Sequence, residues 1–311
     1  MSCRRALAGI CMSFVLFCGC AGLWRGDWPQ GLDGVPPTMQ IASVPFFPQD
    51  EYQCGPAALA MALAWSGLDV QPADLTEKVY TASLQGSLQP AMIAGARRSG
   101  RLAYVITGTD ALIREIAAGH PVIVLQNLGL SWAPLWHYAV AIGYDIPADE
   151  IILHTGRKAR DRTSMGLFQT TWARAASWGL LVLKPGDLPA TAKETDTVEA
   201  ALGLEKARQP AAAVQSYHAA LSRWPQNLPA MMGLGNSYYA LGDLKNSENA
   251  FRRATQIHPE SGAAFNNLAH VLLSLGRREE ALAAARHAVS LGGPHRGLFI
   301  KTLEEIEAAA P

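Results

Sequence analysis

The strongest constraint on the fold of this chain is a period of 34 residues in its last third. Three blocks that begin at Glu194, Leu228 and Gly262 carry an alanine at the same offset. These alanines are Ala220, Ala254 and Ala288. A fixed period of this length indicates that each block is one supersecondary unit, which buries its apolar face by stacking on its neighbours. The blocks are rich in Ala, Leu, Glu and Arg at helical spacing, so residues 194–295 are predicted to form a stack of helix pairs.

The middle block resembles a tetratricopeptide repeat. The residues that fall on the motif are Leu234, Gly235, Tyr238, Gly242, Phe251, Ala254 and Pro259. Small residues let two helices approach closely, and the large rings fill the gap to the next pair. The resemblance implies an all-α solenoid that binds a protein or peptide partner, closed by a capping helix at residues 296–311. An irregular helical bundle is the alternative.

The N-terminus has a pattern typical of a bacterial export signal. Arg4 and Arg5 precede an apolar run from Ala6 to Phe17, which is too short to span a bilayer. The stretch LFCGCAG resembles a lipoprotein box, in which Cys20 is lipidated and becomes the mature N-terminus. The resemblance implies a signal peptide at residues 1–19 and a lipid anchor in the bacterial envelope, on the outer membrane and facing the periplasm. An ordinary secretory signal is the alternative.

A first domain is predicted over residues 41–186, between a Gly- and Pro-rich tether at 20–40 and a linker at 187–193. Its first half has helical patterns, and its second half has short β-rich runs bounded by turns. The expected helices are Pro56–Ser66, Pro72–Tyr80 and Gln89–Ser99, and the expected strands are Pro121–Asn127, His137–Tyr144, Glu150–His154 and Gly179–Lys184. Helices followed by strands predict an α+β domain rather than alternating βαβ units.

Charge and motifs narrow the classes of function. Lys+Arg and Asp+Glu are 26 each, which argues against a nucleic-acid binder that needs a basic face. The chain has no CxxC, HExxH or phosphate-loop pattern, so we expect no metal and no cofactor. The basic stretch GRKARDR (Gly156–Arg162) is predicted to be a solvated turn, with contact to an acidic substrate or partner as the alternative.

Cys54 is the one cysteine beyond residue 20. The export signal would remove or lipidate all the others, so Cys54 has no intrachain partner. An unpaired thiol in an oxidising compartment is a liability, which favours a role for its reactivity. Gly55 and Pro56 place it at the start of a helix, where unpaired N–H groups and the helix dipole stabilise a thiolate.

A thiol nucleophile needs a nearby base, and His137 is the best candidate. It opens the clearest strand pattern, HYAVAIGY, directly after the aromatic loop SWAPLW. His120 lies in a predicted helix-to-strand turn, and His154 ends the next predicted strand.

The stretch around Cys54 (QDEYQCGPAALAMAL), together with HYAVAIGYD, resembles the papain-fold bacteriocin-processing peptidases. These are cysteine peptidases that cut after double-glycine leaders, and the similarity covers about residues 44–184. The resemblance implies that the amide of Gln49 helps to form the oxyanion hole, with Gln53 as the competing choice. In the family an Asp on the strand after the histidine orients the imidazole. Here that strand reads IILHTG, and His154 stands where the carboxylate is expected.

The third catalytic residue therefore stays open between His154, Asp145 and Asp161. The resulting hypothesis is a membrane-anchored cysteine peptidase that acts on a peptide or protein substrate through Cys54 and His137. Two alternatives remain. One is an inactive peptidase-like domain that binds peptides, and the other is an NlpC-type cell-wall peptidase, whose third residue is often histidine.

Overall fold

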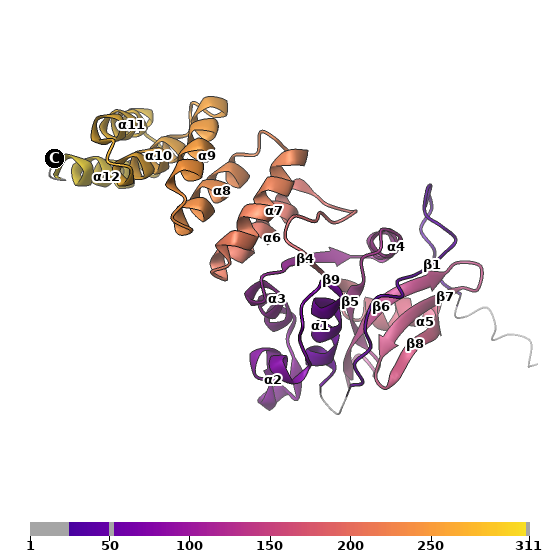
Figure 1. The fold of residues 1–311 in the computed structure, drawn as a ribbon. Coiled ribbons are helices and arrows are strands. Elements are labelled where there is room, and N and C mark those ends of the chain that lie inside the picture. Colours follow the sequence, from indigo (N-terminus) through magenta and orange to yellow (C-terminus); the bar gives the residue numbers. More distant parts are fainter. Residues whose placement is uncertain (1–24, 50–52, 309–311) are drawn as a thin grey trace, which may run out of the picture.

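The chain folds as a sheet-containing α+β unit followed by a row of helices (Figure 1). The computed structural model describes residues 25–49 and 53–308. Cys20 and the signal peptide predicted for residues 1–19 lie outside the described residues. Within the described part, no helix combines the length and the apolar character needed to cross a bilayer.

The first unit begins with the short strand β1 (Thr38–Gln40), inside the segment predicted as a tether, and helices follow it, as predicted. They are α1 (Cys54–Trp65), α2 (Ala73–Val79), the single turn η1 (Ala82–Leu84) and α3 (Gln89–Arg98), with a two-stranded hairpin of β2 (Tyr80–Thr81) and β3 (Gly86–Ser87) before α3. Every residue of α1 from Gly55 to Leu63 is buried. A helix that is apolar on all sides has no face to offer to water, so α1 forms the centre of the core.

A seven-stranded antiparallel sheet follows, formed by the described residues in the order β4-β9-β5-β6-β7-β8, with β1 also paired to β6. The strands are β1 (Thr38–Gln40), β4 (Leu102–Thr107), β5 (Val122–Asn127), β6 (Trp136–Asp145), β7 (Glu150–Thr155), β8 (Lys158–Ser164) and β9 (Trp178–Leu183). The backbone of β1 crosses β6 closely at Gly143, where a Cβ atom would lie 2.4 Å from the carbonyl oxygen of Met39. This contact explains the glycine in an otherwise apolar strand.

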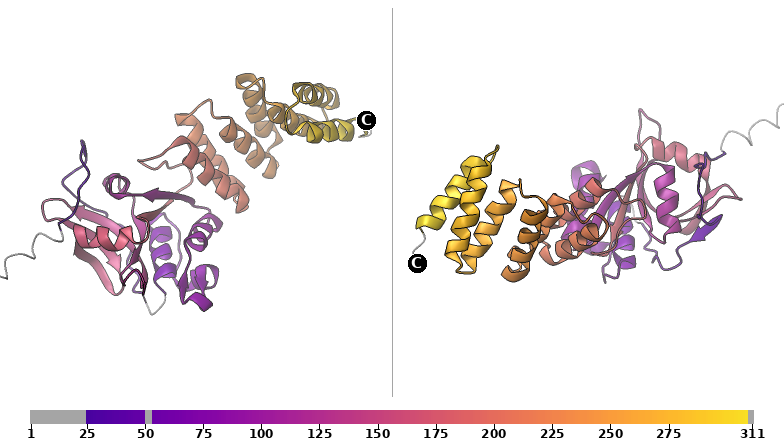
Figure 2. Two further views of the ribbon diagram at one scale, coloured as in Figure 1. Left: turned by 180° about the vertical axis from the view of Figure 1, so that it is seen from behind. Right: turned by 90° about the horizontal axis from the view of Figure 1, so that it is seen from above.

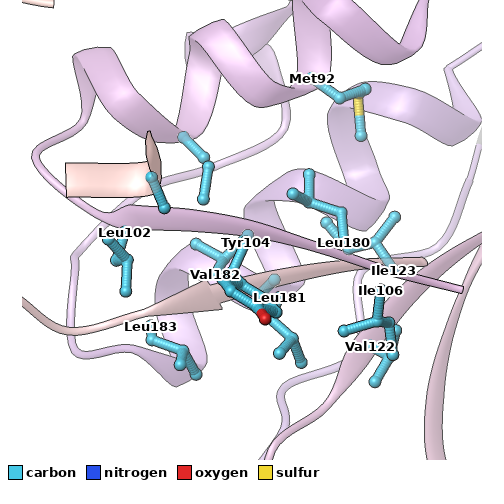
Figure 3. Close-up of a cluster of buried hydrophobic side chains, with 14 of the residues drawn as sticks. Met92, Leu102, Tyr104, Ile106, Val122, Ile123, Leu180, Leu181, Val182 and Leu183 are labelled. Atoms are coloured by element: carbon cyan, nitrogen blue, oxygen red, sulfur yellow. The ribbon is translucent and has the colours of Figure 1, made fainter. Parts of the chain in front are cut away.

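Helices cover both faces of the sheet. Figure 3 shows Met92 of α3 on the side toward which Leu180 and Ile123 point. Helix α5 (Met165–Ala173) lies against β5, where Gln126 Nε2 donates to Thr171 Oγ1 at 2.7 Å. Because successive residues of a strand point to opposite faces, Ile123 and Gln126 place α3 and α5 on opposite sides of the sheet.

The structure corrects the prediction for the basic stretch. Residues 158–162 belong to β8, an exposed edge strand, and are not a solvated turn. Arg162 Nη1 lies 2.7 Å from Glu150 and 3.3 Å from Asp145. An edge strand rich in charges has no apolar alternation for sequence patterns to detect, and charges protect such an edge from pairing with other chains.

The second unit consists of helix pairs that extend away from the sheet (Figures 1 and 2). Its helices are α6 (Glu194–Lys206), α7 (Pro210–Arg223), α8 (Leu228–Ala240), α9 (Leu244–Ile257), α10 (Gly262–Ser274), α11 (Arg278–Leu291) and α12 (Arg296–Ala308). Helices begin at the first residue of each predicted block. A Cβ atom at Gly233 would lie 2.2 Å from the Tyr217 ring, and one at Gly235 would lie 2.5 Å from the Phe251 ring. The small residues of the repeat therefore lie where large rings of the preceding or following helix pack. The order of the elements confirms the predicted fold class, an α+β unit followed by helical repeats.

A buried carboxylate in α4 (Thr109–Ala117) holds the linker that joins the two units. Glu115 is fully buried and accepts hydrogen bonds from the backbone N–H groups of Thr191 at 2.7 Å and Ala190 at 3.1 Å. Its other close contacts are Thr191 Oγ1, which donates at 2.5 Å, and His120 Nδ1 at 2.7 Å. Tyr104 Oη also accepts from Lys193 N–H at 3.1 Å. Burial by itself raises the pKa of Glu115, but the hydrogen bonds from His120 and Thr191 outweigh it and lower the pKa.

We expect Glu115→Gln to lower the free energy of unfolding by about 3 kcal/mol, because the amide NH₂ faces donors and leaves buried groups unpaired. The exposed, salt-bridged Asp110→Asn in the same helix serves as control, with a change of about 0.5 kcal/mol or less. Since the folded-state pKa is lowered, the stabilisation is complete above the usual glutamate pKa of about 4.3 and is lost as pH falls below it. Urea unfolding of the two variants at pH 7 and pH 3.5 measures this. Equal urea midpoints for wild type and Glu115→Gln at pH 7 would contradict the role of this contact.

Candidate active site

The predicted nucleophile and base border one cavity in the first unit. Cys54 is the first residue of α1, and His137 is the second residue of β6. Gln49, Cys54, His137 and Tyr138 all line a cavity of about 1070 Å³ that is open to solvent. The fold thus brings together residues that are far apart in the sequence, at the edge of β6 where β7 ends.

The thiol of Cys54 meets the backbone of β6. Burial is the largest influence on the pKa of Cys54 and raises it above the ordinary thiol value. The backbone N–H groups of Tyr138, Gly55 and Cys54 itself oppose it by favouring the thiolate, as expected at a helix start. The sequence predicted the helix start, and the structure adds the burial that opposes it.

His137 lies in a setting without charge. Its Nε2 is 2.7 Å from Thr155 Oγ1, the hydroxyl at the end of β7. Burial lowers the pKa of His137, and among the described residues its ring has no carboxylate partner. Since the pKa of Cys54 is raised and that of His137 is lowered, a neutral thiol and a neutral imidazole are the favoured resting pair at neutral pH.

The structure corrects the expectation for His154. Its Nε2 lies 3.2 Å from Val44 O, and its Nδ1 accepts from Arg160 N–H at 3.1 Å, so both ring nitrogens bond to the backbone. His154 pairs with Val140 on β6, and the following residue, Thr155, points to the opposite face. That face carries His137, so the threonine takes the position that the sequence assigned to His154.

The two aspartates also lie elsewhere. Asp145 is at the far end of β6, where its carboxylate accepts from Ala148 N–H at 3.1 Å and pairs with Arg162. Asp161 on β8 pairs with Lys158 at 3.4 Å. Neither contacts His137.

Gln49 is a buried amide held on both sides. Its Oε1 accepts from Gly156 N–H at 2.9 Å, and its Nε2 donates to Tyr138 O at 3.1 Å. Because an N–H group only donates and a carbonyl only accepts, these partners fix which end of the amide is oxygen. One Nε2 hydrogen remains beyond the bond to Tyr138. The competing Gln53 is held toward α2, where its Oε1 accepts from Thr76 Oγ1 at 3.1 Å.

The residue that sequence reasoning missed is Thr155. The signal that points to it is the alternation of side chains along β7, once the register with β6 is known. That register shifts between Ala141 and Gly143, and again on β7 between Leu153 and Thr155, where it pairs with β8. Among the described residues, no three His, Cys, Asp or Glu side chains are grouped to hold a metal ion.

Comparison with known families agrees with this architecture. Residues 33–177 match the Peptidase_C39 like family, and residues 198–261 and 234–295 match the tetratricopeptide repeat. A search of curated proteins finds no relative.

Several solved structures are similar to parts of the chain. One is a C39-like peptidase from Bacillus anthracis, at 20% identity and a TM-score of 0.40, over 47% of this chain and 98% of that one. Another is the type III secretion chaperone SycD of Yersinia enterocolitica in complex with a peptide of the translocator YopD, at 17% identity and a TM-score of 0.35, over 37% of this chain and 95% of that one. A third is the first tetratricopeptide domain of Spaghetti (RPAP3) bound to an HSP90 peptide, also at 17% identity and a TM-score of 0.35, over 37% and 90%.

The neutral resting pair leads to a prediction for thiol labelling. We expect alkylation of Cys54 by iodoacetamide, read by peptide mass spectrometry, to be slow at pH 7 and to increase only above the ordinary thiol range. Thr155→Asp places a carboxylate beside Nε2, raises the pKa of His137 and should accelerate labelling at pH 7 about tenfold, one pKa unit of thiolate.

Two further variants test the cause of this acceleration. Thr155→Val keeps the shape of the side chain without the charge and should not accelerate labelling. The double variant Thr155→Asp/His137→Ala should lose the acceleration. If Thr155→Asp is alkylated at the same rate as the wild type at every pH, the charge of His137 does not affect the pKa of Cys54.

Proposed function

We propose that this chain, which carries a C39-like peptidase domain followed by tetratricopeptide repeats, is a cysteine peptidase with Cys54 as nucleophile and His137 as base. The observation that supports it most is that the thiol, the imidazole and a fixed amide border one open cavity. Thr155 holds Nε2 of the ring, which leaves Nδ1 as the nitrogen that exchanges a proton with the thiol.

The proposed reaction starts from the neutral pair. The thiol proton moves to Nδ1 of His137 as the sulfur of Cys54 forms a bond to the substrate carbonyl carbon. The carbonyl oxygen becomes an oxyanion, which accepts from the remaining Nε2 hydrogen of Gln49 and from the N–H of Cys54. The first N–H groups of a helix have no backbone partner within it, and that of Cys54 lies beside its own sulfur. Each such donor is worth about 3–4 kcal/mol in the transition state.

The second half of the reaction releases both products. The C–N bond breaks, and the amine leaves with the proton that His137 carries. A thioester remains on Cys54. Water then gives a proton to His137 and adds to the thioester carbon, and the second tetrahedral species releases the acid and returns the proton to the sulfur. Thr155 orients the ring throughout without adding a charge.

The repeat unit is proposed to bind a protein or peptide partner. The support is the match of residues 198–295 to the tetratricopeptide repeat, together with the extended row of helix pairs (Figure 2). The hydrogen bonds of Glu115 and Tyr104 hold the linker, so a bound partner is kept near the peptidase unit.

An inactive peptide-binding domain is the second candidate. The observation in its favour is the absence of a carboxylate beside His137 among the described residues, together with the raised pKa of Cys54. The third reading, an NlpC-type enzyme, rested on His154 as the orienting residue. Because His154 bonds to Val44 O and Arg160 N, that support is gone.

Hydrolysis of an unfolded protein substrate separates the first two candidates. Cys54→Ala should abolish cleavage, and His137→Ala should reduce it to near background. Gln49→Ala should lower kcat by about 10²–10³-fold through loss of an oxyanion donor. Gln53→Ala is the matched control, expected to remain close to wild type because its amide faces Thr76. Cleavage that survives Cys54→Ala would refute the proposal, and no cleavage by the wild type would favour the inactive binder.

We also propose that the protein is lipid-anchored through Cys20, on the outer membrane and facing the periplasm. The support is the basic start, the apolar run of residues 6–17 and the small residue before Cys20. Cys20→Ser should move the protein from the membrane fraction to the soluble fraction, as measured by fractionation and detergent partitioning. Protein that stays in the membrane fraction would show that another feature anchors it.

A further inference from the structure

Exposed apolar side chains gather around the proposed catalytic pair. Five large ones line the cavity that holds Cys54 and His137, with fractional exposures from 47% to 62%. They are Leu84, Leu88, Leu128, Leu135 and Trp136. Single exposed leucines are ordinary on a protein surface, but a contiguous group around one opening marks a binding surface.

The first wall of the cavity is the segment 84–89, next to the nucleophile. It lies directly against the start of α1, because a Cβ atom at Gly55 would lie 2.3 Å from Ser87 Oγ. The hairpin of β2 and β3 holds this segment, so Leu84 and Leu88 stand beside Cys54 rather than in the core.

The second wall is the β5–β6 hairpin, next to the base. Asn127 Oδ1 accepts from the N–H groups of Gly129 at 3.0 Å and Leu135 at 2.9 Å. Arg174 Nη1 donates to Gly129 O at 2.6 Å. These bonds fix the base of the hairpin, so that Leu135 and Trp136 are presented to the cavity and Trp136 directly precedes His137.

The charge of the lining agrees with an apolar ligand. No carboxylate is among the described residues that line the cavity, and Arg174 is their one permanent charge. Arg174 is engaged with backbone carbonyls of the hairpin. Contact between the exposed apolar side chains of the cavity and apolar groups of a ligand is favourable by about 25 cal/mol per Å² of apolar surface removed from water.

We infer that the site takes an extended peptide segment with bulky apolar side chains next to the scissile bond. This inference rests on the proposed function, since it assigns the cavity to the substrate. A segment with glycine on both sides of the scissile bond would leave both walls in contact with water. Leu84 and Leu88 on one wall, and Leu135 and Trp136 on the other, are the residues that determine specificity.

Binding to the full-length Cys54→Ala variant tests the inference without turnover. Two fluorescent peptides of equal length and charge are compared by anisotropy, one with Leu and Phe around the central bond and one with Gly–Gly there. We expect the apolar peptide to bind about 10–100-fold more tightly. Leu88→Gln and Leu135→Gln should each reduce this preference several-fold. Leu167→Gln on α5 and Leu298→Gln on α12, which are exposed away from the cavity, should not.

The outcomes separate this inference from the proposed function. Equal affinity for the two peptides, or binding of neither, overturns the inference. The inference also fails if the protein binds lipid vesicles but not the apolar peptide, and if Trp132→Ala, at the exposed hairpin tip, abolishes the vesicle binding. If Cys54→Ala prefers the apolar peptide but the wild type does not cleave it, the peptidase proposal fails while the binding preference stands. If the wild type cleaves both peptides equally well, the peptidase proposal stands and the preference fails.

Discussion

The arrangement of the site depends on the backbone of one residue of β6, Tyr138. Its N–H favours the thiolate of Cys54, and its carbonyl accepts from Nε2 of Gln49 at 3.1 Å. His137 is the preceding residue. The start of the buried helix α1 is therefore fixed to the strand edge at the position where the amide is also held. Three side chains from separate parts of the chain reach one cavity because this strand edge remains unpaired beyond the end of β7.

Burial gives this site its electrostatic character. A helix start favours the thiolate, yet removal of the sulfur from water outweighs that contribution. The same loss of water lowers the pKa of His137, and Thr155 supplies a hydroxyl in place of a charge. A thiolate–imidazolium pair is thus disfavoured at rest. Under the proposed mechanism, proton transfer accompanies attack on the substrate rather than preceding it, so the thiol stays protonated until substrate arrives.

The two units of the chain are connected by buried polar contacts as well as by apolar packing. Glu115 and Tyr104 satisfy the backbone of the linker before α6 begins. Backbone N–H groups at such a junction need partners when they are removed from water, and a carboxylate with several donors supplies them. The helical repeats therefore start from a defined position relative to the sheet, which matters if they present a partner or substrate to the cavity.

Much of the fold was predictable from the sequence because its signals are local and periodic. The 34-residue period located the helix pairs, since each block repeats the same small and large residues. The apolar run after Cys54 indicated a buried helix, and HYAVAIGY indicated a strand with His137 at its start. The charged edge strand β8 gave no such signal, because its residues face solvent and need no alternation.

Tertiary structure decided what depends on register and burial. The sequence stretch IILHTG offers His154 and Thr155 one position apart, and side chains one position apart point to opposite faces of a sheet. Register shifts beside β7 determine which of them meets His137, and no pattern within one strand encodes that choice. The sequence by itself determined the repeats, the helix-start cysteine and the strand-start histidine. Only the packed sheet decided that the imidazole meets a threonine, and that burial, rather than the helix dipole, governs the pKa of the thiol.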